Sequence, residues 1–206
     1  MFQDEHIKAA SRVRTRHASA NLRSHYDRVS IVLHWTTAVI VLLQFALAHT
    51  WAFALKPERH LMIVAHMSFG VSLAAVLAIR IVWRMIPAHQ VSPADFGLIE
   101  LASKAVHYLL YVLLVAEAIS GFVLRWSGNE AMNFFGLLIP APFAPFSHAA
   151  RGMIGEAHDL IGWAIIGVAA CHALAALFHH YALRDGVLMR MLTSEPDARD
   201  SYPGKR

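Results

Sequence analysis

The sequence has little cysteine and few charged residues for its length. Cys171 is the single cysteine among 206 residues, which excludes a disulfide within the chain. No C-x-x-C-H motif for covalent haem attachment is present. Charged residues make up 16% and hydrophobic residues 57%, a composition too apolar for an ordinary soluble domain. The net charge of +4 is compatible with binding to nucleic acid or to a membrane surface. The long apolar runs favour the membrane, and no nucleic-acid partner is expected.

Four apolar runs are long enough to cross about 30 Å of hydrocarbon as helices. They cover residues 31–50, 61–83, 106–124 and 158–178. The first run is not followed by the small-residue cleavage site of a signal peptide. We therefore expect an all-α membrane protein, a bundle of four transmembrane helices within residues 25–192. Residues 1–24 and 193–206 are expected to be disordered cytoplasmic tails, the first of them basic.

The basic residues predict the orientation of this bundle. Fourteen of the 18 lysines and arginines lie in the two terminal segments or around the loop between the second and third runs. The positive-inside rule then places both termini in the cytoplasm. The loop 125–157 would face outward. Its segment MNFFGLLIPAPFAPF is apolar and broken by prolines, so we expect it to lie at the membrane interface.

Four histidines fall at two depths in this topology. His34 and His172 lie toward the cytoplasmic side, and His66 and His158 lie toward the outer side. His158 and His172 are 14 residues apart, which is about 21 Å along a helix and about 40° in azimuth. An imidazole inside a membrane needs a partner. We pair His66 with His158 and His34 with His172, each pair joining two helices across the bundle core.

Two levels of two histidines favour haem over zinc. A structural zinc ion needs four ligands in one small sphere, whereas a haem supplies four nitrogens itself. The residue one turn after each paired histidine is small, as a macrocycle lying on the helix requires; these residues are Ala38, Gly70, Gly162 and Ala176. His107 and His49 are followed instead by Tyr111 and Phe53. The pattern predicts two b-type haems in the bundle core, each with two histidine ligands. Such haems have no open position for a gas and transfer electrons.

Several segments resemble the bacterial cytochrome b561 family. The resemblance covers roughly residues 26–192 and is carried by YDRVSIVLHWTTAVIVLL at 26–43, HMSFGVSLAAVLAIRIVWR at 66–84, FGLLIP at 135–140 and HDLIGWAIIGVAACHALAALFHHY at 158–181. It implies an inner-membrane carrier with two haems ligated by the four histidines. Free-standing members of that family act as superoxide oxidases that pass electrons to ubiquinone. This layout of the histidine ligands is also similar to the layout in the cytochrome b subunits of formate dehydrogenases and nickel–iron hydrogenases.

The resemblance also implies a quinone site at His179. The spacing agrees, because His179 follows His172 by seven residues and lies on nearly the same helix face, whereas His180 is turned about 100° away. A histidine with a near-neutral pKa can give a proton to a reduced quinone. The alternative interpretation of His179 is a polar residue that caps the helix at the membrane boundary.

Basic residues near each membrane surface have two interpretations. At the cytoplasmic side, we predict that some pair with carboxylates of the inner haem, namely Arg28, Arg80 and Lys104. His107 is predicted to hydrogen-bond a haem propionate or a quinone. On the outer side, others would attract an anion such as superoxide or anchor the protein by snorkelling; these are Lys56, Arg59, Arg125 and Arg151.

The leading functional prediction is a diheme, quinone-linked oxidoreductase that takes electrons from a periplasmic donor, superoxide in particular. The alternative is a membrane-anchor subunit that relays electrons between a soluble dehydrogenase- or hydrogenase-type partner and the quinone pool. In that case the outer loop would be a docking surface. A histidine-lined metal-ion transporter is disfavoured by the scarcity of acidic residues in the spans. One of those few, Glu117 in the third span, has no assigned role.

Overall fold

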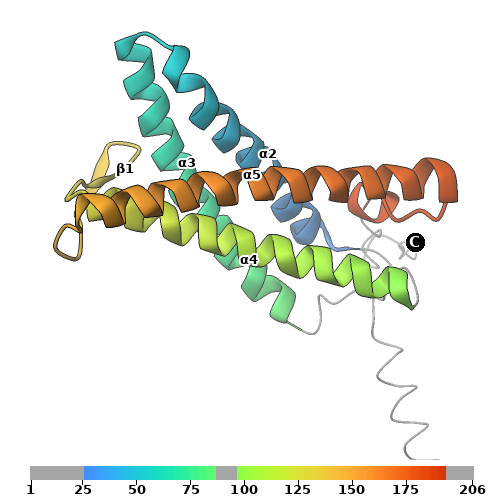
Figure 1. The fold of residues 1–206 in the computed structure, drawn as a ribbon. Helices are drawn as coiled ribbons and strands as arrows, with labels where there is room; N and C mark the ends of the chain where they lie inside the picture. Colours follow the sequence, from blue (N-terminus) through green and yellow to red (C-terminus); the bar gives the residue numbers. More distant parts are fainter. Residues whose placement is uncertain (1–25, 87–96, 194–206) are drawn as a thin grey trace, which may run out of the picture.

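The structure, a computed structural model, describes residues 26–86 and 97–193. The predicted tail 1–24, and all of the predicted tail 193–206 except its first residue, lie outside this part. Four long helices dominate the fold (Figure 1): α2 (Arg28–Thr50), α3 (Lys56–Met85), α4 (Leu98–Ser127) and α5 (His148–Phe178). Shorter elements are η1 (Trp51–Phe53), β1 (Met132–Phe134), β2 (Leu137–Ile139), η3 (His179–Leu183) and η4 (Met189–Met191). Among the described residues, four helical segments are long and apolar enough to cross a membrane, which confirms the predicted four-helix membrane fold.

Capping side chains fix the ends of α2 and α5. Asp27 accepts a hydrogen bond from the Ser30 backbone N–H at 2.9 Å, satisfying one of the free N–H groups at the start of α2. Trp83 Nε1 donates to the same carboxylate at 3.3 Å, so this cap also joins α2 to the end of α3. Ser147 plays the capping role for α5 by accepting from the Ala150 N–H at 3.2 Å.

Two helices extend well beyond the predicted apolar runs. The third run was expected from residue 106 and the fourth from residue 158, but α4 begins at Leu98 and α5 at His148. Apolar composition marks only the part of a helix at hydrocarbon depth, whereas capping and backbone hydrogen bonds carry a helix further. The outer connection is consequently 128–147, shorter than predicted. Arg125 and Arg151 lie in helices rather than in the loop.

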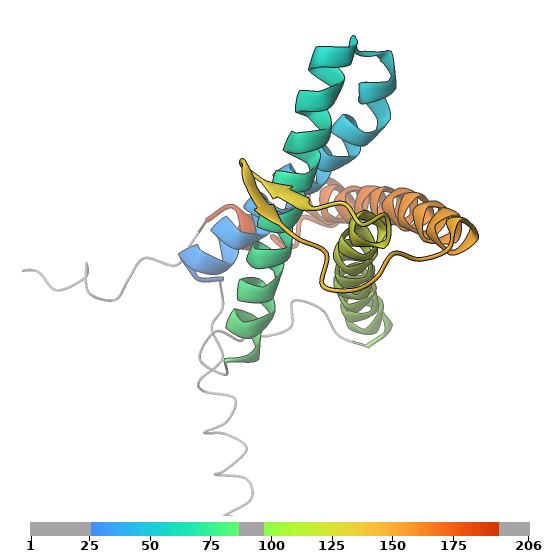
Figure 2. The same cartoon turned by 90° about the vertical axis from the view of Figure 1, so that its left-hand side faces the viewer.

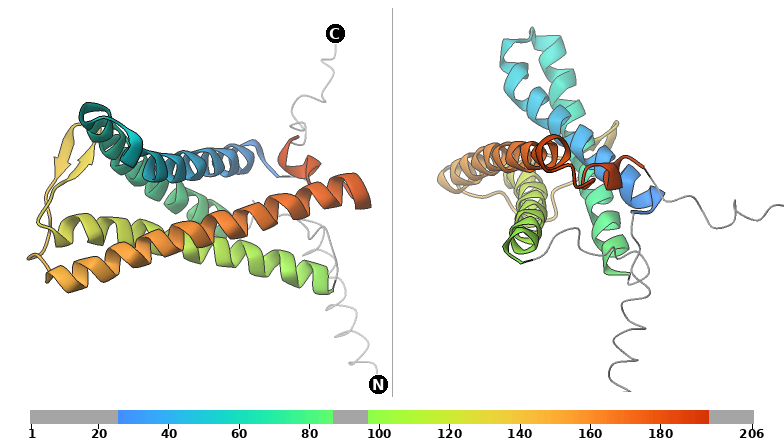
Figure 3. Two further views of the ribbon diagram at one scale, coloured as in Figure 1. Left: turned by 45° about the horizontal axis from the view of Figure 1, so that its top comes forward. Right: turned by 90° about the vertical axis from the view of Figure 1, so that its right-hand side faces the viewer.

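The helices form two antiparallel hairpins that cross. Figures 1 and 2 show the α2–α3 hairpin passing the α4–α5 hairpin at a wide angle. Figure 3 shows the β1–β2 hairpin reaching from the outer ends of α4 and α5 toward the α2–α3 hairpin. Outward faces are apolar, with Val32, Val39 and Leu42 each more than 60% exposed along α2. Such faces need a hydrocarbon surrounding, as in a bilayer.

An apolar layer fills the place where the hairpins cross. Its buried members are Leu77 of α3, Leu114 of α4 and Ile165 of α5. Val41 of α2 packs against them. Ile165 lies seven residues from both His158 and His172, so the layer separates the two predicted histidine levels.

A short β-hairpin lies against α3 in the outer connection, where the sequence predicted only an interfacial loop. Met132 pairs with Ile139, and the turn residues Phe135 and Gly136 both have positive φ angles, 48° and 95°. Positive φ is costly for a bulky residue such as phenylalanine. The fully buried Ser68 offsets this cost, because its Oγ accepts from the Phe135 N–H at 2.9 Å.

We predict that Ser68→Ala destabilises the protein by about 1–3 kcal/mol, the cost of leaving a buried N–H without its acceptor. Thermal unfolding in detergent measures this. Ser72→Ala is the matched control, because the Ser72 hydroxyl donates only to the Ser68 carbonyl one turn back in its own helix. Equal losses in the two variants would contradict the anchoring role of Ser68.

Candidate functional site

The four paired histidines come together at two levels, as the sequence analysis expects. At the outer level the ring centroids of His66 and His158 are 6.3 Å apart. At the inner level the centroids of His34 and His172 are also 6.3 Å apart. The planes of the two rings are inclined by 84° and 71° in these pairs, so neither pair stacks face to face.

This separation fits one metal ion between two imidazoles. An imidazole nitrogen binds a first-row metal at about 2 Å and lies about 1.15 Å from its ring centre, so two axial imidazoles have centroids about 6.3 Å apart. His107 also faces His172, but their centroids are only 4.9 Å apart, too close for a shared metal. The distance therefore favours His34 over His107 as the partner of His172.

Hydrogen bonds at the outer level leave the metal-binding nitrogens available. His66 Nδ1 lies 3.2 Å from the Gln44 carbonyl oxygen, which can only accept, so Nδ1 carries the proton. His158 Nδ1 lies 3.0 Å from Ser120 Oγ, and that hydroxyl donates its own proton to the Glu117 carbonyl at 2.9 Å. His158 Nδ1 is thus the donor. Both rings keep a free lone pair on Nε2, the form that binds a metal.

A cavity of about 480 Å³ surrounds this outer pair. It is lined from all four helices, and His66, His158, Gly70 and Gly162 all face it. Among the described residues, two buried side-chain oxygens lack a hydrogen-bond partner, Gln44 Oε1 and Glu117 Oε2. Both residues line the same cavity. A roomy, mainly apolar cavity with two free imidazole nitrogens fits a haem held by two histidines.

Glycines allow close approach around this cavity. A Cβ on Gly70 would lie 3.0 Å from Gln44 Nε2, and one on Gly162 would lie 3.3 Å from Glu117 Oε1. A Cβ on Gly121 would lie 3.2 Å from His158 Cε1. The glycines after His66 and His158 leave room that the side chains of Gln44 and Glu117 occupy in this structure, so its predicted use by a macrocycle stays a prediction.

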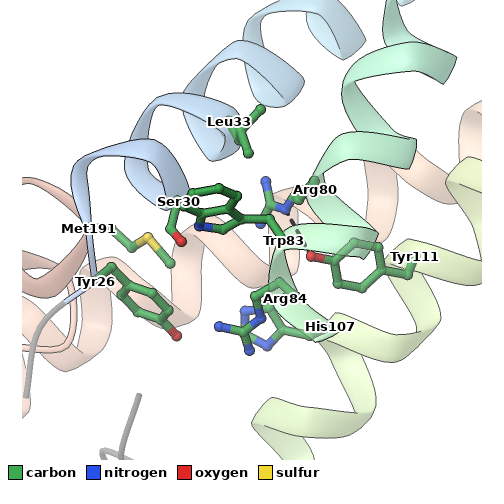
Figure 4. Close-up of a pocket in the computed structure, with 9 residues that line it drawn as sticks. All are labelled: Tyr26, Ser30, Leu33, Arg80, Trp83, Arg84, His107, Tyr111 and Met191. Atoms are coloured by element: carbon green, nitrogen blue, oxygen red, sulfur yellow. Dashed lines mark hydrogen bonds between the residues drawn. The ribbon is translucent and has the colours of Figure 1, made fainter. Parts of the chain in front are cut away.

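The inner level is polar and more tightly filled. Arg80 donates from Nη2 to His34 Nδ1 at 3.0 Å and from Nε to the Tyr111 hydroxyl at 2.9 Å. Figure 4 shows the Arg80 guanidinium reaching Tyr111 beside a small cavity of about 30 Å³, which is lined also by Arg84 and His107. His34 and His172 do not line this cavity.

Arg80 determines the proton position on His34. A guanidinium can only donate, so His34 Nδ1 is an acceptor here and the ring proton sits on Nε2. Metal binding through Nε2 requires this proton to move and Arg80 to take another acceptor. The ring spacing at the inner level therefore fits a metal, whereas the space around it requires Arg80 to shift.

His179 has a carboxylate partner that the sequence analysis does not identify. Its Nδ1 pairs with Asp185 Oδ2, within a turn that includes Arg184 and Gly186 at positive φ. Desolvation works to raise the pKa of Asp185, but the hydrogen bonds from His179 and the Val187 N–H outweigh it and lower that pKa below its ordinary value. The carboxylate is thus charged at neutral pH and orients the His179 ring.

The other predicted basic residues have partners of their own. Lys104 pairs with Glu100 one turn earlier on α4, and Arg28 is the first residue of α2. Neither lines the inner cavity, so their predicted contact with haem carboxylates stays a prediction. Arg59 donates to the carbonyls of Trp51 and Ala52 at 3.1 and 2.8 Å.

Two outer arginines share one carboxylate. Arg125 and Arg151 both pair with Glu130, the second at 2.7 Å, and both line the outer cavity. Two guanidiniums and one carboxylate leave one excess positive charge within this cluster, while the acidic side chains of Glu117 and Asp159 also line the cavity.

Comparison with known proteins agrees with this architecture. The family model for prokaryotic cytochrome b561 matches residues 25–194. The chain is 32% identical over 177 residues to cytochrome b561 homolog 2 of Escherichia coli, covering 84% of this chain and 93% of the relative. It is 27% identical over 173 residues to the probable superoxide oxidase CybB of Yersinia pestis, covering 83% and 97%. It is 27% identical over 176 residues to cytochrome b562 of Cereibacter sphaeroides, covering 81% and 94%. The chain therefore belongs to the prokaryotic cytochrome b561 family, membrane electron-transfer cytochromes that bind b-type haem.

Proposed function

We propose that this protein is a diheme cytochrome b of the bacterial inner membrane that carries single electrons from an outer donor to ubiquinone near the cytoplasmic side. The observation that carries the proposal is the 6.3 Å ring separation found in both histidine pairs. Haem b supplies an iron that changes between two oxidation states and takes two axial ligands. His66 and His158 would hold the outer haem, and His34 and His172 the inner one.

The protein's own residues prepare the outer site. The Gln44 carbonyl and the Ser120 hydroxyl accept the Nδ1 protons of His66 and His158, which fixes both tautomers. The walls of the cavity are mainly apolar, and low polarity and hydrogen bonding to the ligands set the potential of such a site.

At the inner site, Arg80 is the residue that must change partners. Its guanidinium lies within reach of His34 and Tyr111 and is matched in geometry to a carboxylate. We infer that Arg80 leaves His34 for a haem propionate, and that Tyr111 keeps its hydrogen bond and guides this shift. His107, which donates to the Ser103 carbonyl at 2.6 Å, stays a polar neighbour and not a ligand.

The distribution of basic residues supports an orientation with both termini in the cytoplasm, since 14 of the 18 lysines and arginines lie in the segments assigned to that side. Both chain ends then lie on the side of His34 and His172. The β-hairpin and the Arg125–Glu130–Arg151 cluster lie outside.

Superoxide is the proposed donor. A relative with 27% identity is named a probable superoxide oxidase. The excess positive charge of Arg125 and Arg151 beside the outer cavity would attract an anion. Two superoxide anions would each lose one electron and become dioxygen. The two electrons and two cytoplasmic protons would convert one ubiquinone to ubiquinol.

His179 is the proposed proton donor for the quinone. Asp185 holds its Nδ1, so Nε2 is the nitrogen that can exchange a proton with a quinone oxygen. His179 is the first residue after α5, two turns beyond His172, which places it on the inner side of the inner haem ligands.

The alternative function is a membrane-anchor subunit for a soluble redox partner. The turn of the β-hairpin favours it, because Phe135, Leu137 and Leu138 are each more than 60% exposed and offer an apolar docking surface. The same surface suits the membrane interface. Purified protein separates these functions: superoxide-dependent ubiquinone reduction by the chain alone supports an oxidase, and reduction only with an added partner supports a subunit.

We predict that His66→Ala and His158→Ala each remove the outer haem, and that His34→Ala and His172→Ala each remove the inner one. A haem held by one imidazole loses half of its axial ligation. Haem quantification and redox titration of each variant measure the loss. His107→Ala is the control and should keep two haems. Depletion of different haems in His34→Ala and His172→Ala would contradict the pairing.

We also predict that His179→Gln lowers quinone reduction about 10²-fold or more, the usual contribution of a positioned acid–base group, with both haems retained. Asp185→Asn should reproduce part of this loss, because the ring is then no longer oriented. His180→Gln is the matched control on the adjacent residue. Stopped-flow oxidation of the prereduced protein by a soluble quinone measures the step. Similar rates in His179→Gln and His180→Gln would rule out the assignment.

A further inference from the structure

The two helical hairpins repeat one arrangement of polar residues. On α2, Gln44 follows His34 by ten residues, and on α4, Glu117 follows His107 by ten residues. On α3 and on α5, a histidine is followed by glycine after four residues and by a basic side chain after fourteen; these sets are His66, Gly70 and Arg80, and His158, Gly162 and His172. The α2–α3 and α4–α5 hairpins of Figure 1 therefore carry the same spacing of these residues.

Contacts within each hairpin follow the same correspondence at the outer level. The Gln44 carbonyl lies 3.2 Å from His66 Nδ1, and Glu117 Oε2 lies 3.3 Å from His158 Nδ1. In each hairpin the first helix thus places one residue behind the outer histidine of the second helix.

The contacts of the glycines show the same correspondence between the two hairpins. The amide end of Gln44 fills the space where a Cβ on Gly70 would lie, and the carboxyl end of Glu117 fills that space at Gly162. Each of these side chains also presents a buried oxygen that lacks a hydrogen-bond partner among the described residues. Gln44 and Glu117 therefore occupy matching places on opposite sides of the outer cavity.

The inner level shows the correspondence as well. Within the first hairpin, Arg80 lies against His34 at 3.0 Å. Within the second, His172 lies against His107 with ring centroids 4.9 Å apart. The repeat thus extends along the full length of both hairpins and is not confined to one pair of contacts.

One difference between the hairpins has a chemical consequence. His66 Nδ1 faces a neutral backbone carbonyl, whereas His158 Nδ1 faces the Ser120 hydroxyl and the Glu117 carboxyl group together. A side chain held against the outer nitrogen of a ligating imidazole fixes the orientation of the ring.

We propose that Gln44 and Glu117 are equivalent positioning residues of the outer metal site, one from each hairpin, and that Glu117 fixes the orientation of the His158 ring. This inference rests on the proposed function, since it takes the outer pair as haem ligands. The inference gives a role to Glu117, the acidic residue in the third predicted span, to which the sequence alone assigns none.

The test replaces Glu117 by glutamine, which keeps the length of the side chain and makes the two hairpins alike at this position. We expect Glu117→Gln to retain both haems and the low-spin ferric EPR signal of the outer haem, because the amide can hold the ring as the carboxyl group does. Glu156→Ala is the matched control for the alanine variant described next, because this exposed carboxylate lies two residues from His158 on α5 and does not line the cavity. It should leave the outer haem unchanged.

A second variant removes the contact. Glu117→Ala takes the side chain away from Gly162 and from His158, so we expect partial loss of the outer haem and a broadened EPR signal, while the inner haem does not change. Full outer-haem occupancy with an unchanged EPR signal in Glu117→Ala, or equal haem loss in the glutamine and alanine variants, would overturn the proposal. A wild-type protein without two haems would instead refute the proposed function, so the two failures are distinguishable.

Discussion

The constraint on which this structure depends is that an imidazole inside an apolar bundle must satisfy both of its nitrogens. At the outer level each hairpin supplies the acceptor for its own histidine, through the Gln44 carbonyl and the Ser120 hydroxyl. The second nitrogen then has no partner within its hairpin and faces the other hairpin across the cavity. Because an unpaired polar group in this setting is costly, a shared ligand between His66 and His158 stabilises the pairing of the two hairpins.

The apolar layer between the two histidine levels also contributes to the pairing of the two hairpins. Leu77, Leu114 and Ile165 pack where the hairpins cross, about seven residues from each level along α5. This layer keeps water from connecting the inner polar cluster with the outer cavity. His158 and His172 lie 14 residues apart on α5, about 21 Å along the helix axis, with this layer between them.

The sequence predicts the levels of the histidines well, because depth and azimuth follow from helix geometry once the spans are identified. His34, His66, His158 and His172 meet as expected for this reason. Gln44 and Ser120 were missed because they act on histidines of neighbouring helices, and the register between helices is not encoded in the spacing along one of them. The β-hairpin was missed because its Phe135–Gly136 turn depends on the hydroxyl of Ser68, 67 residues away, and carries no Asn-Gly signal.

The repeat also explains why two hairpins would form two metal sites of different kinds. His66 corresponds to His158, so the outer pair joins equivalent positions and can form a single site. His34 corresponds to His107, and Arg80 corresponds to His172. The inner pair, His34 with His172, therefore joins two positions that do not correspond to each other. The two remaining positions form a second combination, His107 with Arg80. A guanidinium has no lone pair to give to a metal, and this second combination cannot bind one. It remains as a cationic, hydrogen-bonding cluster at the depth of the inner site, where carboxylates of a bound haem would need their partners. One difference between corresponding helices, Arg80 on α3 where α5 has His172, therefore separates two sets of residues. The first set would bind the metal of the inner site, and the second would bind the carboxylates of the bound haem.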